Sequence, residues 1–274
     1  MTAPLEGHGL TFRVGAKTLL EDVSLSVGSG RLTVIIGPNG AGKSTLVKLL
    51  SGETAPASGR VLYGGEDVRS IEPWRLACLR VVLPQASRLA FPFTAGEVVR
   101  IGIDGIGRGL GRRDRDAILE EALRRADVAH LATRAYQSLS GGEQQRTQFA
   151  RVLAQLAAGR SVSREQVLLL DEPIASLDLK HQIALLDAAA EFAADGVAVL
   201  AVLHDLNLAA AYADDVLVMS RGRAAAFGPP REIITDSMVS EVFDVALKVG
   251  ASPGPGQPFL IPPRRRTASA SPAP

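Results

Sequence analysis

The chain has only one cysteine and almost no net charge, and these two features exclude several classes of protein. Its single cysteine, Cys78, excludes an internal disulfide framework and suits a reducing compartment, so we expect this residue to fill space in the core. The 30 lysines and arginines nearly balance the 29 aspartates and glutamates, and the formal net charge of +1 gives no global field that attracts nucleic acid. We therefore expect no nucleic-acid partner.

Long apolar runs are also missing. The N-terminal residues do not show the charged start and apolar run of a signal peptide. The longest apolar candidate, Val197–Leu203, ends at His204 and falls far short of the roughly 18 residues that span a bilayer. Hydrophobic residues make up 46% of the 274 residues, which is enough for a sizeable core. If the protein works at a membrane, we expect it to do so through a partner.

Short apolar segments separated by glycines predict an α/β fold. Alternating apolar residues from Leu10 to Val27 indicate a small antiparallel layer, and the β-branched run Leu32–Ile36 indicates a buried strand. Val167–Leu170 and Val197–Leu203 are continuous apolar runs, as expected for strands of a parallel sheet that is covered on both faces. Between them we predict a helix that starts near Lys180 and ends before Gly196.

Residues 86–158 differ in composition from the segments on either side. They contain the Gly/Arg-rich stretch Gly105–Arg115, followed by an Ala/Leu/Glu/Arg pattern that predicts a helix over Asp116–Ala126. We interpret this region as a helical subdomain inserted into the α/β core, so that residues 1–250 form a single domain.

The last part of the chain, residues 251–274, is a tail rich in Pro, Ser and Arg. It has too little apolar content to pack, so we expect it to be disordered. Its run Arg264–Arg266 could touch lipid or RNA, although the composition favours a solvated tail.

A phosphate-binding motif occupies residues 37–45, between the strand predicted over Leu32–Ile36 and a helix predicted over Ser44–Ser51. It satisfies the GxxxxGK[ST] pattern, in which main-chain N–H groups wrap phosphates and the helix adds the positive end of its dipole. Lys43 would place its charge on the β- and γ-phosphates, and the Ser44 hydroxyl would bind Mg²⁺. The residues expected to bind the nucleotide are Gly37, Pro38, Asn39, Gly40, Ala41, Gly42, Lys43, Ser44 and Thr45.

Two adjacent acids, Asp171 and Glu172, follow the apolar run Val167–Leu170. Open α/β sheets bind ligands at the carboxyl ends of their strands. Two carboxylates next to a buried strand are costly unless a cation compensates them, so Asp171 suits Mg²⁺, directly or through water. Glu172 would then polarise the attacking water. Without the phosphate loop, an exposed acidic turn before Pro173 would be the simpler interpretation.

His204 follows the other buried strand, so its side chain should lie along the same sheet edge as Asp171. There it could hydrogen-bond the γ-phosphate and hold the water, although a lone histidine is more often an ordinary core or loop residue. Gln85 follows the apolar segment Val81–Pro84 and has no distinctive signal of its own.

The segment Leu139-Ser-Gly-Gly-Glu-Gln-Gln-Arg146 predicts the start of a helix. Ser140 and Glu143 have the spacing of a capping box, and the two glycines between them let backbone N–H groups approach an anion. A helix N-terminus with exposed N–H groups is a phosphate site, whereas a capping box alone is a common structural feature. The residues expected to contact phosphate here are Ser140, Gly141 and Gly142. The predicted buried face of the helix consists of Phe149, Val152, Leu153 and Leu156.

The order of these motifs resembles that of ATP-binding cassette (ABC) ATPases, over roughly residues 5–240. The resemblance implies a P-loop NTPase core with an N-terminal antiparallel β layer and an inserted helical subdomain, and it implies that the chain binds ATP and Mg²⁺. Glu172 would be the catalytic base and His204 the switch histidine. Gln85 would link Mg²⁺ and the water to the contact with the transporter.

The same resemblance implies a dimer. Asp178, in Ser176-Leu-Asp178, would be the D-loop acid that meets the opposite subunit. Leu139–Arg146 would be the signature segment of the family. Two subunits would sandwich two ATP molecules, each between the phosphate loop of one subunit and the signature segment of the other.

The chain departs from the family pattern at two places. Ile174 and Ala175 stand where the family usually has Thr-Ser or similar, a position that touches no catalytic atom. The family commonly stacks an aromatic residue on adenine just before the first strand turn. Alignment on Gly15 puts Val14 at that place, with Phe12 two residues earlier, so the adenine contact stays open between Phe12 and none.

One cassette without a membrane span resembles the separate ATPase subunits of importers, and most of all those that serve haem, siderophores and cobalamin. Leu83–Thr94, which leads into Glu97-Val-Val, and an extra segment at Ala158–Gln166 are similar to haem (hemin) import ATPases. The resemblance implies a homodimer on a polytopic permease dimer, served indirectly by a periplasmic haem-binding protein. The subunit would be peripheral, at the cytoplasmic face of a bacterial inner membrane.

Two alternatives stay open. The cargo could instead be siderophore-iron or cobalamin, because the ATPase never touches it. A soluble, non-transport ABC ATPase is the competing class, for instance a nucleic-acid or ribosome-associated regulator that uses the basic tail. Neighbouring genes for a permease and a secreted binding protein would distinguish them.

Overall fold

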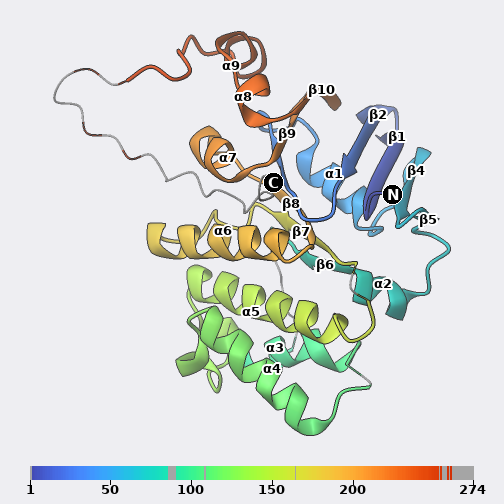
Figure 1. The fold of residues 1–274 in the computed structure, drawn as a ribbon, viewed down its shortest axis with the longest axis vertical. Coiled ribbons are helices and arrows are strands. Elements are labelled where there is room, and N and C mark those ends of the chain that lie inside the picture. Colours follow the sequence, from blue (N-terminus) through green and yellow to red (C-terminus); the bar gives the residue numbers. More distant parts are fainter. Residues whose placement is uncertain are drawn as a thin grey trace, which may run out of the picture.

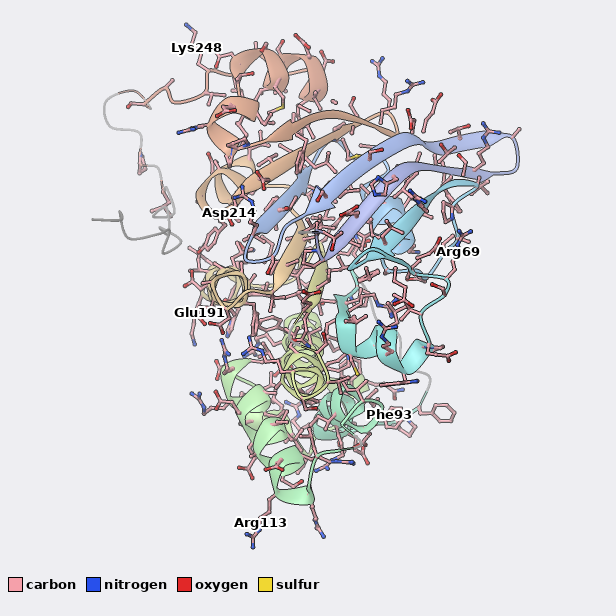
Figure 2. All side chains as sticks on the ribbon, turned by 45° about the vertical axis from the view of Figure 1, so that its right-hand side comes forward. Arg69, Phe93, Arg113, Glu191, Asp214 and Lys248 are labelled. Carbon is pink, nitrogen blue, oxygen red and sulfur yellow. The ribbon has the colours of Figure 1, made fainter. Side chains whose placement is uncertain are left out.

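The computed structural model describes residues 2–85, 91–107, 109–163 and 165–252, together with residues 254, 258 and 260. Two sheets occupy one half of the molecule, and several helices pack in the other half (Figure 1). Figure 2 shows the side chains, with Arg113 at the far end of the helical half. Most of the predicted tail, including Arg264–Arg266, lies outside the described residues. Within the described part of the chain, no helix is both long and apolar enough to cross a membrane.

Four of the described strands form an antiparallel layer at the N-terminal side. β1 (Leu5–Val14) and β2 (Lys17–Val27) pair with each other, and β4 (Ser58–Tyr63) pairs with the other edge of β1. β5 (Glu66–Asp67) then completes the order β2-β1-β4-β5. The antiparallel layer predicted from Leu10 to Val27 is confirmed, although β4 and β5 had no signal in the sequence.

The second sheet has the order β10-β9-β3-β8-β7-β6 among the described residues. Its strands are β3 (Leu32–Ile36), β6 (Arg80–Leu83), β7 (Val167–Asp171), β8 (Ala198–Val202), β9 (Asp215–Ser220) and β10 (Arg223–Gly228). All run parallel except β10, which is antiparallel at the edge. Every residue of β3, β7 and β8 is buried, which confirms the prediction of strands covered on both faces. Because β6, β7 and β8 are parallel neighbours, their carboxyl ends meet at one edge.

Helices cover both faces of the parallel sheet (Figure 1). In chain order they are α1 (Lys43–Leu50), α2 (Pro73–Leu79), α3 (Ala95–Asp104), α4 (Arg112–Arg125), α5 (Gly141–Gly159), α6 (Leu179–Ala194), α7 (Leu206–Tyr212), α8 (Pro230–Ile233) and α9 (Asp236–Phe243), with the 3-10 turns η1 (Ala129–Leu131) and η2 (Tyr136–Ser138). The predicted helices at Ser44–Ser51 and from Lys180 are confirmed, each starting one residue earlier than expected.

One predicted helix boundary was wrong. The helix predicted from Asp116 already begins at Arg112, because Gly111 takes the N-cap position and Asp114 favours the helix start. The extra segment expected at Ala158–Gln166 overlaps the last two residues of α5, which ends at Gly159.

Two hydrophobic cores lie on opposite faces of the parallel sheet. Val34 and Leu168 belong to the core that includes α5 and α6, whereas their chain neighbours Ile35 and Leu169 belong to the core beneath α1 and the antiparallel layer. Cys78 is fully buried in the first core, as predicted. The predicted buried face of α5 is confirmed at Phe149, Val152, Leu153 and Leu156.

Polar side chains of α5 hold both β6 and the end of α2, which precedes it. Arg151 donates to the Val82 carbonyl at 2.9 Å, and Gln155 donates to the Ala77 carbonyl at 2.9 Å. Arg151 is partly buried, and burial lowers the pKa of its guanidinium. These bonds fix the strand that leads to Gln85 relative to the helix that starts at the signature segment.

Candidate active site

The predicted phosphate loop lies between β3 and α1, and two of its glycines are required by their surroundings. At Gly37 the φ angle is +150°, and a Cβ would lie 2.2 Å from the Met219 carbonyl oxygen. At Gly42 the φ angle is +98°, and a Cβ would lie 2.6 Å from the Leu20 side chain. Gly42 is also the N-cap of α1, so the free N–H groups of the first helical turn open onto the loop.

Lys43 is buried at the start of α1. Its ammonium donates to the carbonyls of Gly37, at 2.8 Å, and Pro38, at 3.0 Å. Burial lowers the pKa of this ammonium, while the charges of Glu172 and Asp171 oppose the shift. The loop therefore holds one cation against its own backbone, next to two acids.

Ser44 and Asp171 are in direct contact, although 127 positions separate them in the chain. The Ser44 hydroxyl donates to Asp171 Oδ1 at 3.1 Å. Asp171 ends β7 and is only 5% exposed. Burial raises the pKa of its carboxyl, and the bond from Ser44 partly offsets that shift.

Two side chains that follow the neighbouring strands β6 and β8 contact the carboxylate of Glu172. His204 Nε2 lies 2.8 Å from Glu172 Oε1, and the Gln85 amide donates to Glu172 Oε2 at 2.7 Å. The φ angle of Glu172 is +49°, an unfavourable conformation for a residue with a side chain. Gln85, Glu172 and His204 follow β6, β7 and β8, so the prediction that His204 and the acids share one sheet edge is confirmed. The same edge brings in Gln85, which only the family resemblance had assigned to the site.

A cleft of about 300 Å³ opens beside the phosphate loop. Its lining residues are Lys17, Leu19, Asn39, Gly40, Gly42, Lys43, Ser44, Thr45 and Glu172. Lys17 and Leu19, at the start of β2, were missed in the sequence, because only the fold brings this turn over the loop. Phe12, the one candidate for adenine stacking, does not line the described cleft and packs partly buried against the core. Val14, at the aligned position, is 58% exposed and also outside it.

The signature segment lies elsewhere in the same chain. Its capping box is formed as predicted: the Ser140 N–H donates to Glu143 Oε2 at 2.7 Å, and the Glu143 N–H donates to Ser140 Oγ at 3.4 Å. Ser140 and Gly141 are exposed at the N-terminus of α5, beside the Ser176 carbonyl, which approaches Gly142. No residue of Leu139–Arg146 lines the described cleft. A single chain thus does not bring its phosphate loop and its signature segment together.

Asp178, at the N-cap of α6, is also exposed and outside the cleft. Its Oδ1 accepts the backbone N–H of His181 at 3.0 Å. The cap raises helix stability and leaves the carboxylate at the surface next to the signature segment.

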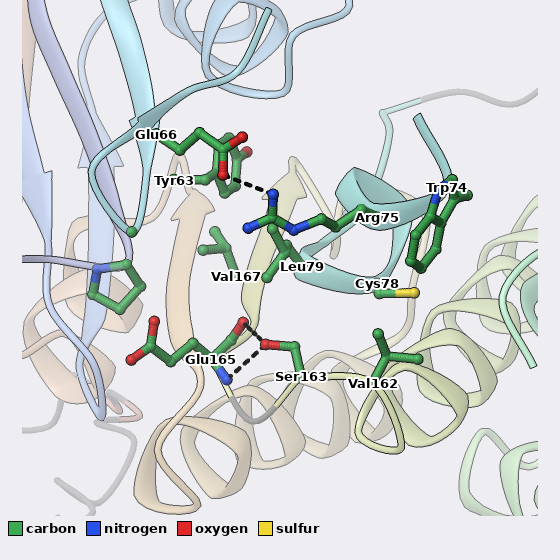
Figure 3. A pocket seen from close by; sticks show the side chains of 12 residues that line it. Tyr63, Glu66, Trp74, Arg75, Cys78, Leu79, Val162, Ser163, Glu165 and Val167 are labelled. Atoms are coloured by element: carbon green, nitrogen blue, oxygen red, sulfur yellow. Dashed lines mark hydrogen bonds and ion pairs between the residues drawn. The ribbon is translucent and has the colours of Figure 1, made fainter. Parts of the chain in front are cut away.

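A second hollow, of about 350 Å³, lies between α2, the β4–β5 hairpin and the segment before β7 (Figure 3). Arg75 and Glu66 form a 2.8 Å ion pair across it, and the half-exposed Trp74 stands at its rim. None of its described lining residues belongs to the predicted site. The larger hollow is therefore not where the chemistry is expected.

The strand–loop–helix around Lys43, the acid held by Gln85 and His204, and the separate signature helix define an ATP-binding cassette. A family model described as "ABC transporter" matches residues 20–175, and the chain belongs to this family. It is the ATP-binding subunit of an ABC transporter, an ATP hydrolase coupled to transport.

Individual proteins and a solved structure are similar to this chain over most of its length. "Hemin import ATP-binding protein HmuV" of Rhizobium meliloti (strain 1021) is 42% identical, over 94% of this chain and 98% of that protein. The protein of the same name from Chelativorans sp. (strain BNC1) is 46% identical over the same shares. A solved "ATP binding subunit of ABC transporter" superposes with a TM-score of 0.74 at 25% identity, over 88% of this chain and 97% of that one.

Proposed function

We propose that this chain is the ATPase that powers hemin import through an ABC transporter. The observation that carries the proposal is the 42–46% identity to hemin import ATP-binding proteins over nearly the full length of both chains. The sequence resemblance of Leu83–Thr94 and of the segment before β7 to haem importers supports the same proposal. Siderophore-iron and cobalamin are the alternative cargoes.

ATP binding is assigned to the phosphate loop, residues 37–45. The N–H groups of the first turn of α1 face the cleft, and Lys43 supplies the charge for the β- and γ-phosphates. Phosphate oxygens would take over the hydrogen bonds that the ammonium now makes to the Gly37 and Pro38 carbonyls. The desolvation free energy of the buried Lys43 ammonium is thus offset both before and after ATP binds, because its N–H donors are paired in both states.

The residues beside the loop fit Mg²⁺. Within the described residues, no group of three or more His, Cys, Asp and Glu could hold a metal alone, and phosphate oxygens and waters would complete the ligand set of Mg²⁺. The Ser44 hydroxyl and the buried Asp171 carboxylate, 3.1 Å apart, offer the hard oxygen atoms that Mg²⁺ prefers, and Gln85 offers an amide oxygen. A bound Mg²⁺ would neutralise charge on the β- and γ-phosphates.

Hydrolysis is assigned to Glu172 as the base that accepts the proton of the attacking water. Gln85 and His204 hold one carboxylate oxygen each, so the side chain has little freedom to turn away. His204 is 44% exposed and can exchange its bond to Glu172 for one to the γ-phosphate. Gln85 directly precedes the helical subdomain in the chain, so it connects the site to that subdomain.

The active assembly is proposed to be a homodimer. Each phosphate loop needs anion-binding groups on its open side, and Ser140, Gly141 and Gly142 carry such groups without facing the cleft of their own chain. A second subunit in head-to-tail orientation would place them there, with Asp178 at the contact. The dimer would dock on a permease dimer at the cytoplasmic face of the inner membrane, downstream of a periplasmic haem-binding protein.

Disruption of the gene tests the cargo. Cells that lack this chain should fail to grow on hemin as the only iron source, while growth on siderophore-iron and cobalamin uptake stay normal. Normal growth on hemin with defective use of siderophore-iron would move the proposal to the alternative cargo.

A further inference from the structure

The acid at the start of α6, Asp178, is held by a side chain as well as by the backbone. His181 Nδ1 lies 2.7 Å from Asp178 Oδ1, the same oxygen that caps the helix. Its bonds from the His181 backbone and then from the His181 ring keep the pKa of the Asp178 carboxyl below its usual value. The carboxylate is 67% exposed, whereas the ring that holds it is only 16% exposed.

The other ring nitrogen of His181 faces a different part of the molecule. His181 Nε2 lies 3.2 Å from Arg146 Nη1, at the end of the signature segment, and 3.4 Å from Asp127 Oδ2. Arg146 also donates to the Asp127 carbonyl at 2.7 Å. One histidine therefore joins three places: the start of α6, the signature helix and the turn after α4.

Asp127 is an unusual anchor for this cluster. Its φ angle is +55°, so its backbone adopts the left-handed conformation directly after α4. The bonds from His181 and then Lys180 lower the pKa of its carboxyl. The residue lies within the predicted helical subdomain, so the cluster spans from that subdomain to the core.

The bridge holds in both protonation states of the ring. With Nδ1–H donated to Asp178, the Nε2 of a neutral ring is an acceptor for the Arg146 guanidinium. A protonated ring has a second N–H, which the Asp127 carboxylate can accept. The link between the two elements does not depend on which state is present.

We propose that His181 is a positioning residue that couples Asp178 to the helical subdomain through Arg146 and Asp127. The inference rests on the proposed function, in which Asp178 meets the opposite subunit. When the helical subdomain moves, the bridge carries Asp178 with it, so that the dimer contact and the signature segment engage together. His181 itself touches neither the cleft nor the phosphate loop.

The test compares ATP hydrolysis by the purified full-length chain and its variants. His181→Ala should lower kcat about 10-fold and leave the KM for ATP within about 2-fold, because the cleft is intact and only alignment is lost. His181→Asn places an amide near the Nδ1 position and cannot reach Asp127, so it should be as slow as His181→Ala. Wild-type turnover in His181→Asn would show that His181 acts only as a local cap and would overturn the bridge.

A double-mutant cycle isolates the bridge. In Asp127→Asn, the asparagine tolerates the left-handed backbone and the negative charge is lost. This single variant should therefore already lower kcat. If His181 acts through Asp127, the double variant should be no slower than His181→Ala, whereas independent roles would make the two losses multiply and refute the proposal. Lys180→Ala is the matched control, since Lys180 contacts the same Asp127 carboxylate at 3.4 Å and has no described bond to Asp178. It should keep turnover within about 2-fold.

Two further variants separate this inference from the proposed function. Retained hydrolysis in Glu172→Gln would refute the assigned site, and wild-type turnover in Asp178→Ala would refute both the D-loop role and the bridge. Loss of turnover in both, with normal kcat in His181→Ala, would overturn the bridge alone. Melting temperatures of all variants are recorded, and if His181→Ala does not fold, His181→Asn and Asp127→Asn carry the test.

Discussion

Replacing Glu172 with glutamine is the most informative single change at the candidate site. The substitution keeps the shape of the side chain and removes only its capacity to accept a proton. In the structure, Glu172 Oε2 accepts the Gln85 amide at 2.7 Å, and the glutamine oxygen can take that place. The new NH₂ group then faces His204 Nε2, which can accept it when the imidazole proton sits on Nδ1.

The magnitudes of the two effects differ widely. Because both hydrogen bonds can persist, the free energy of unfolding should change by no more than about 1 kcal/mol. Loss of a positioned general base should slow hydrolysis about 10²–10⁴-fold, which corresponds to roughly 2.7–5.5 kcal/mol in the activation free energy. ATP binding should not weaken, because the variant removes a negative charge next to the phosphates.

The assay measures phosphate release at saturating ATP and ATP affinity by calorimetry on the same preparations. Glu165→Gln, an exposed glutamate before β7, is the matched control and should behave as wild type. Hydrolysis by Glu172→Gln within a few-fold of wild type would mean that the base lies elsewhere. Loss of ATP affinity in the same variant would mean that Glu172 shapes the binding cleft instead.

Three further changes test the rest of the site. Lys43→Ala should weaken ATP binding at least ~100-fold, since it deletes the cation of the phosphate loop, and wild-type affinity in calorimetry would refute the loop assignment. Ser140→Arg should leave ATP binding by the isolated subunit intact and block hydrolysis, and a mixed dimer with Lys43→Ala should keep at most one competent site; a mixture that hydrolyses no more ATP than either variant alone would argue for a monomeric enzyme. Gly37→Ala should lower the melting temperature by roughly 5–10 °C, because its Cβ would sit 2.2 Å from the Met219 carbonyl oxygen, whereas Gly40→Ala, with open space around the added Cβ, should have a smaller effect on stability.

Local rules were sufficient where neighbouring residues decide the structure. The capping box at Ser140 follows from the spacing of two side chains on one helical turn, and it forms as predicted. The buried strands β7 and β8 follow from continuous apolar runs, and their parallel pairing puts His204 next to Glu172.

Local patterns alone could not predict several contacts between distant segments. Gln85 reaches Glu172 only because β6 is the neighbour of β7, and no local pattern specifies that pairing. Lys17 and Leu19 line the cleft because the β1–β2 turn folds over the phosphate loop. The bridge from Asp178 through His181 to Asp127 likewise joins residues about fifty positions apart.

One helix boundary could not be predicted from the local pattern. The helix was expected only from Asp116, after the Gly/Arg-rich stretch, yet Asp114 and the Gly111 cap favour a start of α4 at Arg112. Packing of Ala122 and Leu123 into the core then stabilises the whole helix, and this tertiary gain exceeds the unfavourable interaction of Arg112 and Arg113 with the helix dipole.

The central claim is that ATP hydrolysis at Glu172 of this chain drives hemin import. The most direct measurement is the initial rate of labelled hemin uptake by cells that lack the gene and carry either the wild-type chain or Glu172→Gln. The account predicts that the wild-type chain restores uptake and that Glu172→Gln, expressed at the same level, does not. Hemin uptake that is equal in both, or equal without either chain, would contradict it.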